Sequence, residues 1–322
     1  MTGTVLVYSR EEISGDGLIK LPFVAAVRAA FPDARLTWCA ATGKTVYATT
    51  LGAVVEDVID EVVTTGRVGL EPAQLFGRVM DGRRFDVVID TQSHLGSTLI
   101  VRRLARRTFV SPTAGFLFST RKPDRPWPDD LGERLHLLAE LAAGRPLARA
   151  ALPIADEAAR RRAAERLPEG GVYVGFAPGA GGSERRWPLD RYLGLARLQA
   201  GRGRTPVFFL GPAEAAEADA IRRACPEALL PQADAPTDVA LTVALAGRLA
   251  AAVANDAGPA HMLAAGGAPM LSLFRERRKA AKFKPAAPRN AVLIAEDYGA
   301  PEMDRLPVGD ADAALEALLS DA

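Results

Sequence analysis

The sequence predicts an α/β protein built from two Rossmann-like domains, each with a parallel sheet covered by helices. Short apolar runs alternate with amphipathic segments, and this alternation stops in a proline-rich middle and then restarts. The stretch Pro-Glu-Gly-Gly at 168–171 is typical of a linker. With 322 residues the chain is long enough for two domains. We expect them at 1–167 and 168–322, with sheets facing a central cleft and a last helix that could return to the first domain.

The first half is expected to contain a strand at 5–8, a helix at 18–31 and further strands at 35–40, 54–59, 85–90 and 108–110. Residues 111–132 hold four prolines and predict a long irregular segment. Helices are predicted at 133–143 and 156–166. Strands separated by helices in this way favour a parallel sheet.

The second half repeats the pattern. Strands are predicted at 172–176, 206–210, 229–230, 249–254 and 270–274, and helices at 189–200, 213–224, 238–247, 259–266 and 312–319. Ligands of such sheets bind beyond the carboxyl ends of the strands, so functional residues are sought there.

The composition is that of an ordinary globular protein, with 48% hydrophobic residues and a net charge of +1. This charge gives no reason to expect a nucleic-acid partner. Two distant cysteines, Cys39 and Cys225, predict a reducing cytoplasm rather than a disulfide framework. With only three histidines a metal site is not expected. Neither a signal peptide nor an apolar run of about 18 residues is evident.

The most informative stretch is 253–269. Its apolar beginning stops at Asn255-Asp256, and Gly258-Pro259 then open a helix of small residues that carries His261. A strand, a polar turn and a helix N-terminus present free N–H groups to an anion. A carboxylate in the turn would repel phosphate but suits a ribose hydroxyl, so a nucleotide or sugar site is predicted. The alternatives are a simple helix cap and a packed structural histidine.

Two other strand ends carry polar turns. The glycine-rich segment 178–183 precedes Arg185 and Arg186, and such a loop can cradle a diphosphate. Glu214 follows the next strand and could bind both ribose hydroxyls. The alternatives are a flexible loop with solvated arginines and an acidic first helical turn.

The first strand is followed by Ser14-Gly15-Asp16-Gly17, which predicts either a general base at the mouth of the sheet or a capping aspartate. A dinucleotide fingerprint and a P-loop are both missing from the sequence. Residues 275–289 hold seven basic side chains and one acidic one, which fits either a solvated face or a phosphate site.

Together these motifs resemble one family. Residues 256–265 are similar to the Asp-Thr/Ser-Gly-x-x-His-x-x-Ala-Ala signature of the ADP-heptose:lipopolysaccharide heptosyltransferases, glycosyltransferase family 9. Gly15-Asp16 with Leu21-Pro22, the loop at 178–188 and the segment 211–214 resemble other family motifs in the same order. The resemblance covers most of the chain and is weakest over 111–170.

The resemblance implies a GT-B fold, with an acceptor-binding first domain, a nucleotide-sugar-binding second domain, and an inverting transfer that needs neither metal nor cofactor. Asp16 would be the base. The acceptor, an anionic glycolipid or oligosaccharide such as a lipopolysaccharide core, would contact Gly15, Gly17, Lys20 and Gln92. The donor, an ADP-sugar, would contact Gly179, Ala180, Arg185, Arg186, Glu214, Asp256, Ala257, Gly258 and His261.

Three departures from the family pattern leave alternatives open. Ala257 replaces a hydroxyl residue, Phe274-Arg275 lacks the following Gly-x-Thr, and residues 10–12 lengthen the first loop. The alternatives are another GT-B enzyme acting on nucleotide sugars, such as a different sugar transferase or an epimerase, and a non-catalytic nucleotide-sugar-binding protein. A peripheral contact with the inner face of the cytoplasmic membrane is a further open point.

Overall fold

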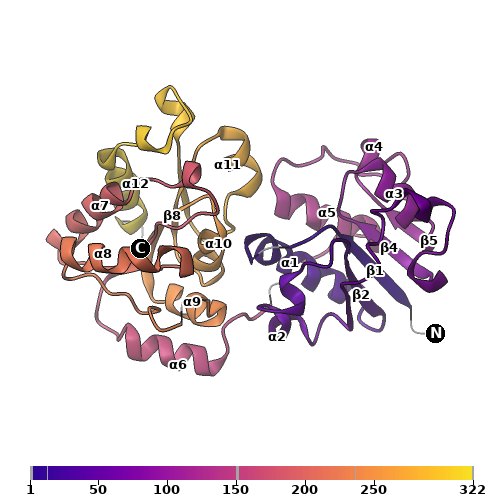
Figure 1. The fold of residues 1–322 in the computed structure, drawn as a ribbon, viewed down its shortest axis with the longest axis horizontal. Helices are drawn as coiled ribbons and strands as arrows, with labels where there is room; N and C mark the ends of the chain where they lie inside the picture. The colour runs from indigo at the N-terminus through magenta and orange to yellow at the C-terminus, as the bar shows by residue number, and fades with distance from the viewer. Residues whose placement is uncertain (1–2, 13, 150–151, 236, 321–322) are drawn as a thin grey trace. The chain divides into compact units, whose positions relative to one another are not determined.

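A computed structural model describes residues 3–12, 14–149, 152–235 and 237–320. The chain divides into two compact units, Met1–Leu152 and Pro153–Ala322 (Figure 1). The division falls before the boundary predicted at 167/168, and the Pro-Glu-Gly-Gly stretch lies inside the second unit.

The first unit is a parallel five-stranded sheet in the order β3-β2-β1-β4-β5. Its strands are β1 (Thr4–Ser9), β2 (Arg35–Ala40), β3 (Glu61–Val63), β4 (Phe85–Asp90) and β5 (Ala105–Val110). Its helices are α1 (Ser14–Ala30), α2 (Gly52–Val55), α3 (Leu95–Arg102), α4 (Thr113–Phe116) and α5 (Leu131–Ala143), with 3₁₀ turns η1 (Val46–Ala48), η2 (Pro72–Leu75) and η3 (Met80–Gly82).

The second unit has a parallel sheet in the order β10-β9-β8-β6-β7. Its strands are β6 (Tyr173–Ala177), β7 (Thr205–Phe208), β8 (Leu249–Asn255), β9 (Met270–Phe274) and β10 (Asn290–Ile294). Its helices are α6 (Glu157–Arg166), α7 (Leu189–Gly201), α8 (Ala218–Ala224), α9 (Val239–Ala246), α10 (Gly258–Ala265), α11 (Arg277–Phe283) and α12 (Val308–Ser320), with 3₁₀ turns η4 (Ser183–Arg185), η5 (Pro212–Glu217), η6 (Ala295–Tyr298) and η7 (Met303–Arg305).

The inner strands β1, β6 and β8 are buried on both faces, as expected for sheets covered by helices. In the first unit Leu6 of β1 lies opposite Val88 of β4, and both belong to one apolar core. In the second unit Phe176 and Phe208 stack between β6 and β7 at a centroid distance of 5.2 Å. The predicted α/β class with parallel sheets is therefore confirmed.

Two strand predictions are wrong, and one strand was not predicted. Residues 54–59 form the end of α2 and a turn, because Val55 and Ile59 pack at helical spacing and Ile59 N–H donates to the Val55 carbonyl at 2.8 Å. The third strand is β3 instead. The segment 229–230 forms an isolated bridge from Leu229 to Val207 rather than a strand. The basic segment 275–289 contains α11 and is followed by β10, a strand that the sequence analysis missed.

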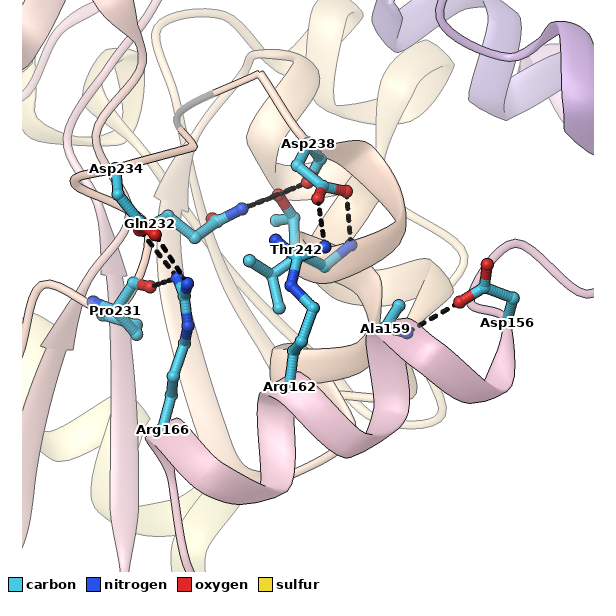
Figure 2. A network of polar contacts seen from close by, with 10 residues as sticks. Asp156, Ala159, Arg162, Arg166, Pro231, Gln232, Asp234, Asp238 and Thr242 are labelled. Carbon is cyan, nitrogen blue, oxygen red and sulfur yellow. Dashed lines mark hydrogen bonds and ion pairs between the residues drawn. The ribbon is translucent and has the colours of Figure 1, made fainter.

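Helix α6 belongs to the second unit because it packs on α9. Figure 2 shows its polar contacts: Arg162 pairs with Asp238 at 2.8 Å and Arg166 pairs with Asp234 at 2.7 Å. Asp156 accepts a hydrogen bond from Ala159 N–H at 2.7 Å and so caps the helix. These contacts explain why the division lies before α6.

Helix α12 also packs within the second unit, and the expectation that it could return to the first domain stays a prediction. Ala311, Leu315 and Leu318 lie in the core of the second unit. Arg202, the C-cap of α7, donates to Asp312 at 2.5 Å. The apolar face of the helix therefore packs against the sheet of the second unit and against α7.

Both cysteines are buried thiols. Cys39 lies in β2 and Cys225 directly follows α8. Burial, and then the nearby Glu12 carboxylate, raise the pKa of Cys39 to about 12. Burial also raises the pKa of Cys225. Each cysteine therefore stays a neutral thiol at physiological pH.

Replacing Asp238 tests the junction between α6 and α9. Its carboxylate accepts from Leu241 N–H at 2.9 Å, which caps α9, and also pairs with Arg162. Asp238→Ala should lower the free energy of unfolding by about 1–2 kcal/mol, mostly through the lost cap. Asp238→Asn keeps a capping oxygen and should lose much less, as measured by urea unfolding. Equal losses in the two variants would contradict the capping role.

Candidate functional site

The first predicted site begins at the carboxyl end of β1. Asp16 lies half-buried in the first turn of α1, which starts at Ser14 and so includes Gly15 and Gly17. A Cβ on Gly17 would come within 2.3 Å of Val46, and the Tyr47 hydroxyl donates to the Gly17 carbonyl at 2.7 Å. Gly17 therefore makes room for η1 of the same unit.

Beneath this turn lies a buried ion pair. Lys20 Nζ donates to Glu12 Oε1 and to Ser9 Oγ, each at 2.8 Å. The other Glu12 oxygen accepts from Trp38 Nε1 at 3.1 Å, and Glu12 is only 2% exposed. Such a pair is tolerated when both ions are hydrogen-bonded. The structure thus gives Lys20 internal partners, and its contact with the acceptor stays a prediction.

A second polar cluster lies at the end of β4. Asp90 is fully buried and accepts from Gln92 N–H at 2.9 Å, Thr98 Oγ1 at 2.7 Å and Ser111 Oγ at 2.9 Å. Burial raises the pKa of Asp90 to about 6, against the lowering effect of these hydrogen bonds. Thr113 contacts Thr98 at 2.7 Å. The cluster therefore fixes the backbone of Gln92, the predicted acceptor contact.

The second predicted site is organised by Asn255 at the end of β8. Its Oδ1 accepts from Trp187 N–H at 3.0 Å and its Nδ2 donates to the Pro178 carbonyl at 2.8 Å. The side chain is fully buried. It therefore holds both ends of the glycine-rich loop against β8.

Glu214 of η5 faces this loop. It is 6% exposed, and within the described part of the chain its carboxylate has no hydrogen-bond partner. A Cβ on Gly179 would lie 2.9 Å from the carboxyl group, and one on Gly211 would lie 2.9 Å from Oε2. The absence of side chains at these two glycines is what admits the carboxylate. Its oxygens are not among the fully buried, unsatisfied atoms of the described residues, so they stay accessible and free to accept hydrogen bonds from a ligand.

Asp256 lies beside basic side chains. Burial raises its pKa, the charges of Arg185 and Lys279 oppose this rise, and the nearby Glu276 carboxylate adds to it. A Cβ on Gly181 would lie 2.8 Å from Arg185 Nη2, so the guanidinium lies close along the loop. Arg185 and Lys279 therefore lie close enough to Asp256, at the end of β8, for their charges to act on its carboxylate.

The remaining predicted donor contacts lie in the loop after β6 and at the start of and on α10. Ala180 lies in the loop after β6, Ala257 caps α10, and Gly258 begins that helix. His261 is on α10, where burial lowers its pKa to about 4, so the ring is neutral at physiological pH. Arg186 pairs with Glu217 at 2.5 Å and donates to the Pro178 carbonyl, which gives it a loop-holding function.

The described residues contain no group of three or more His, Cys, Asp or Glu side chains placed to hold a metal ion. Nor does the described part of the chain include a helix that is long and apolar enough to span a membrane.

Comparison with known proteins identifies the family. The family model described as glycosyltransferase family 9 (heptosyltransferase) matches residues 74–308, well over half of the chain. The protein belongs to glycosyltransferase family 9. It is therefore a glycosyltransferase. The match covers all of the predicted donor contacts, whereas Asp16 precedes it. Curated proteins gave no sequence match to this family 9 chain.

Solved structures show the same fold. A family 9 glycosyl transferase from Veillonella parvula aligns over 99% of this chain and 98% of its own, with 18% identity and a TM-score of 0.70. Escherichia coli ADP-heptose lps heptosyltransferase II aligns over 100% and 99%, with 19% identity and a TM-score of 0.67. Escherichia coli heptosyltransferase WaaC, in its structure with ADP, aligns over 98% and 99%, with 18% identity and a TM-score of 0.67. The GT-B fold of this family 9 chain is thereby confirmed.

Sequence reasoning missed three residues that hold these sites together. Glu12 and Asp90 are buried carboxylates, a rare placement that sequence patterns do not indicate. Asp90 ends a strongly apolar strand, which was the available signal. Asn255 adjoins the predicted Asp256, but its two hydrogen bonds reach residues far away in the sequence.

The Asp90 cluster predicts a pH effect on the stability of this family 9 chain. The pKa of Asp90, about 6 in the folded state, lies above the ordinary 3.8, so the folded state binds the proton more tightly. Its stabilising contribution is complete below about pH 4 and is lost as the pH rises through 6. Relative to Asp90→Asn, the wild-type protein should lose about 1 kcal/mol of unfolding free energy between about pH 5 and 7.

Asp86 of the same strand is the matched control, because its pKa is lowered, mainly by the hydrogen bond from Thr4 N–H. Its stabilising contribution is lost only as the pH falls below the ordinary 3.8. The stability of wild type relative to Asp86→Asn should stay constant over the same range. Urea unfolding at each pH measures both differences, and parallel curves for Asp90→Asn and wild type would refute the assignment.

Proposed function

We propose that this glycosyltransferase moves heptose, or a closely related sugar, from an ADP-sugar to a lipopolysaccharide-core or similar envelope acceptor. The transfer inverts the anomeric centre and needs no metal. The first unit binds the acceptor and the second binds the donor. The protein works in the cytoplasm, with peripheral contact at the inner face of the membrane where a lipid-linked acceptor is presented.

The partnerless carboxylate of Glu214 carries the donor assignment. Two carboxylate oxygens suit the two vicinal hydroxyls of a ribose, and binding would supply the hydrogen bonds that the folded chain leaves unmade. Arg185 and Lys279 are the cations near Asp256, and they suit the diphosphate. The N-terminus of α10 adds free N–H groups. The solved relative with ADP supports the choice of adenine nucleotide.

Catalysis needs a base for the acceptor hydroxyl and stabilisation of the leaving diphosphate. Asp16 fits the first task because it lies half-buried at the carboxyl end of β1. Arg185 and Lys279 fit the second, because fixed cations stabilise the charge that develops on the leaving group. Since these cations are part of the chain, a metal ion is not required to neutralise the diphosphate.

The direct test is incubation with ADP-heptose and a heptose-free lipopolysaccharide core. Mass spectrometry should show an acceptor heavier by one heptose, NMR should show an inverted anomeric configuration, and EDTA should leave the rate unchanged. Retention of configuration or a strict metal requirement would contradict the mechanism. Transfer from UDP- or GDP-sugars in preference to ADP-heptose would contradict the donor assignment.

Donor binding depends on Glu214 and Arg185. Glu214→Ala and Arg185→Ala should each weaken ADP binding by roughly 1–3 kcal/mol, because each removes a charged hydrogen-bonding group. Titration calorimetry measures the affinity. Glu227→Gln, an exposed change in the same unit, is the control and should bind as wild type. If both test variants also bind ADP as wild type does, the donor site lies elsewhere.

The base assignment depends on Asp16. Asp16→Asn keeps the shape of the side chain but cannot take a proton, so kcat should fall by ~10²–10⁴-fold. ADP affinity should hardly change, because the donor contacts lie in the other unit. Asp33→Asn, an exposed change in the same unit, serves as the control. Asparagine caps a helix about as well as aspartate, so near-normal turnover in Asp16→Asn would leave only a capping role.

A further inference from the structure

The first unit carries large apolar side chains in solvent. Phe76 is 92% exposed, Leu117 is 64% exposed and Leu95 is 53% exposed. Leu99 lies one helical turn after Leu95 and is half-buried. Clustered apolar side chains of this size on a surface mark an interaction site more often than isolated ones do.

These side chains lie around a single helix. Phe76 directly follows η2, which packs on α3, and Arg103 at the end of α3 donates to the carbonyls of Gln74, Leu75 and Gly77 at 2.5, 2.7 and 3.1 Å. Leu117 follows α4, which also packs on α3, and Figure 1 shows these helices together beside β5. We call Phe76, Leu95, Leu99 and Leu117 the α3 patch.

The α3 patch is bordered by arginines. Arg102 continues the exposed side of α3, with its guanidinium 5.9 Å from the ring centroid of Phe118. Arg106 and Arg107 are exposed on β5, the edge strand of the sheet. Residues 91–123 contain six basic and no acidic side chains. Arg107 pairs with Asp86 of β4 at 3.8 Å, whereas Arg102 and Arg106 form no ion pair among the described residues, so these two supply most of the positive charge of the border.

We infer that the α3 patch docks on an anionic bilayer surface. Phe76, Leu95 and Leu117 enter the boundary between headgroups and acyl chains, and the arginines lie at the level of the lipid phosphates. The inference rests on the proposed function in one respect, namely that a lipid-linked acceptor makes membrane docking useful.

The position of the α3 patch suits such an acceptor. Helix α3 starts three residues after Gln92, and the Asp90 cluster fixes Gln92 at the carboxyl end of β4. Leu95 is thus at the same end of the sheet as the predicted acceptor contacts. Docking here would bring that edge of the first unit to the membrane surface.

Vesicle co-sedimentation of the full chain tests the inference. Phosphatidylcholine vesicles that contain phosphatidylglycerol should bind the protein, pure phosphatidylcholine should bind it much less, and added salt should weaken binding. Phe76→Ser with Leu117→Ser should lower the partition coefficient about tenfold. Arg102→Gln with Arg106→Gln should lower it about tenfold as well. These side chains are exposed, so unfolding midpoints should stay near that of wild type.

Matched controls come from the second unit. Leu198→Ser and Arg222→Gln change an exposed leucine and an exposed arginine of α7 and α8, and both should bind vesicles as wild type does. Wild-type binding by the two double variants, or no binding of wild type to anionic vesicles, would overturn the inference. So would light scattering that shows an oligomer which Phe76→Ser dissolves, because a second copy would then cover the α3 patch.

Transfer to a delipidated core oligosaccharide separates this inference from the proposed function. The double variants should keep wild-type turnover on this soluble acceptor while losing vesicle binding. A wild-type protein that binds vesicles through the α3 patch but transfers no sugar would refute the proposed function and leave the docking surface standing.

Discussion

In each unit, one buried polar side chain at the carboxyl end of an inner strand holds the loops at that end of the sheet. In the first unit β4 pairs with β1 and ends in Asp90, and in the second β8 pairs with β6 and ends in Asn255. Beyond the sheet edge the regular ladder of backbone hydrogen bonds stops, and loop groups need other partners. Asp90 and Asn255 supply them, so loops that would otherwise be mobile are held by the most rigid part of each unit.

The two candidate sites differ in how far their charged side chains are buried. Below Asp16, the ions of Glu12 and Lys20 are buried and bind each other, Ser9 and Trp38, so this charge is internally balanced. At the end of β8, Arg185 and Lys279 lie near Asp256 and Glu276, and Arg185 also pairs with Glu184 at 3.8 Å, so the charges there are balanced but partly exposed. A ligand could reach the charges at the end of β8, whereas the buried ion pair below Asp16 is closed to it.

The sequence allowed the sheets to be predicted because apolar runs and amphipathic helices alternate clearly. It failed at 54–59, where a short apolar run suits a strand or a helical turn equally well, and at β10, which follows a segment dominated by basic residues. The turn positions of Glu214 and Asp256 could be predicted from their places after strands. The burial of Glu12 and the two hydrogen bonds of Asn255 could not, because they depend on contacts between distant parts of the chain.

The burial of Cys39 and Cys225 has a practical consequence. A maleimide or a methanethiosulfonate spin label reacts with an accessible thiolate, and both native thiols are buried and protonated. A single cysteine introduced at an exposed site in each unit could therefore be labelled in the otherwise unaltered chain. Pulsed electron spin resonance or fluorescence energy transfer could then record the distance between the units with and without nucleotide, and so follow domain motion in solution.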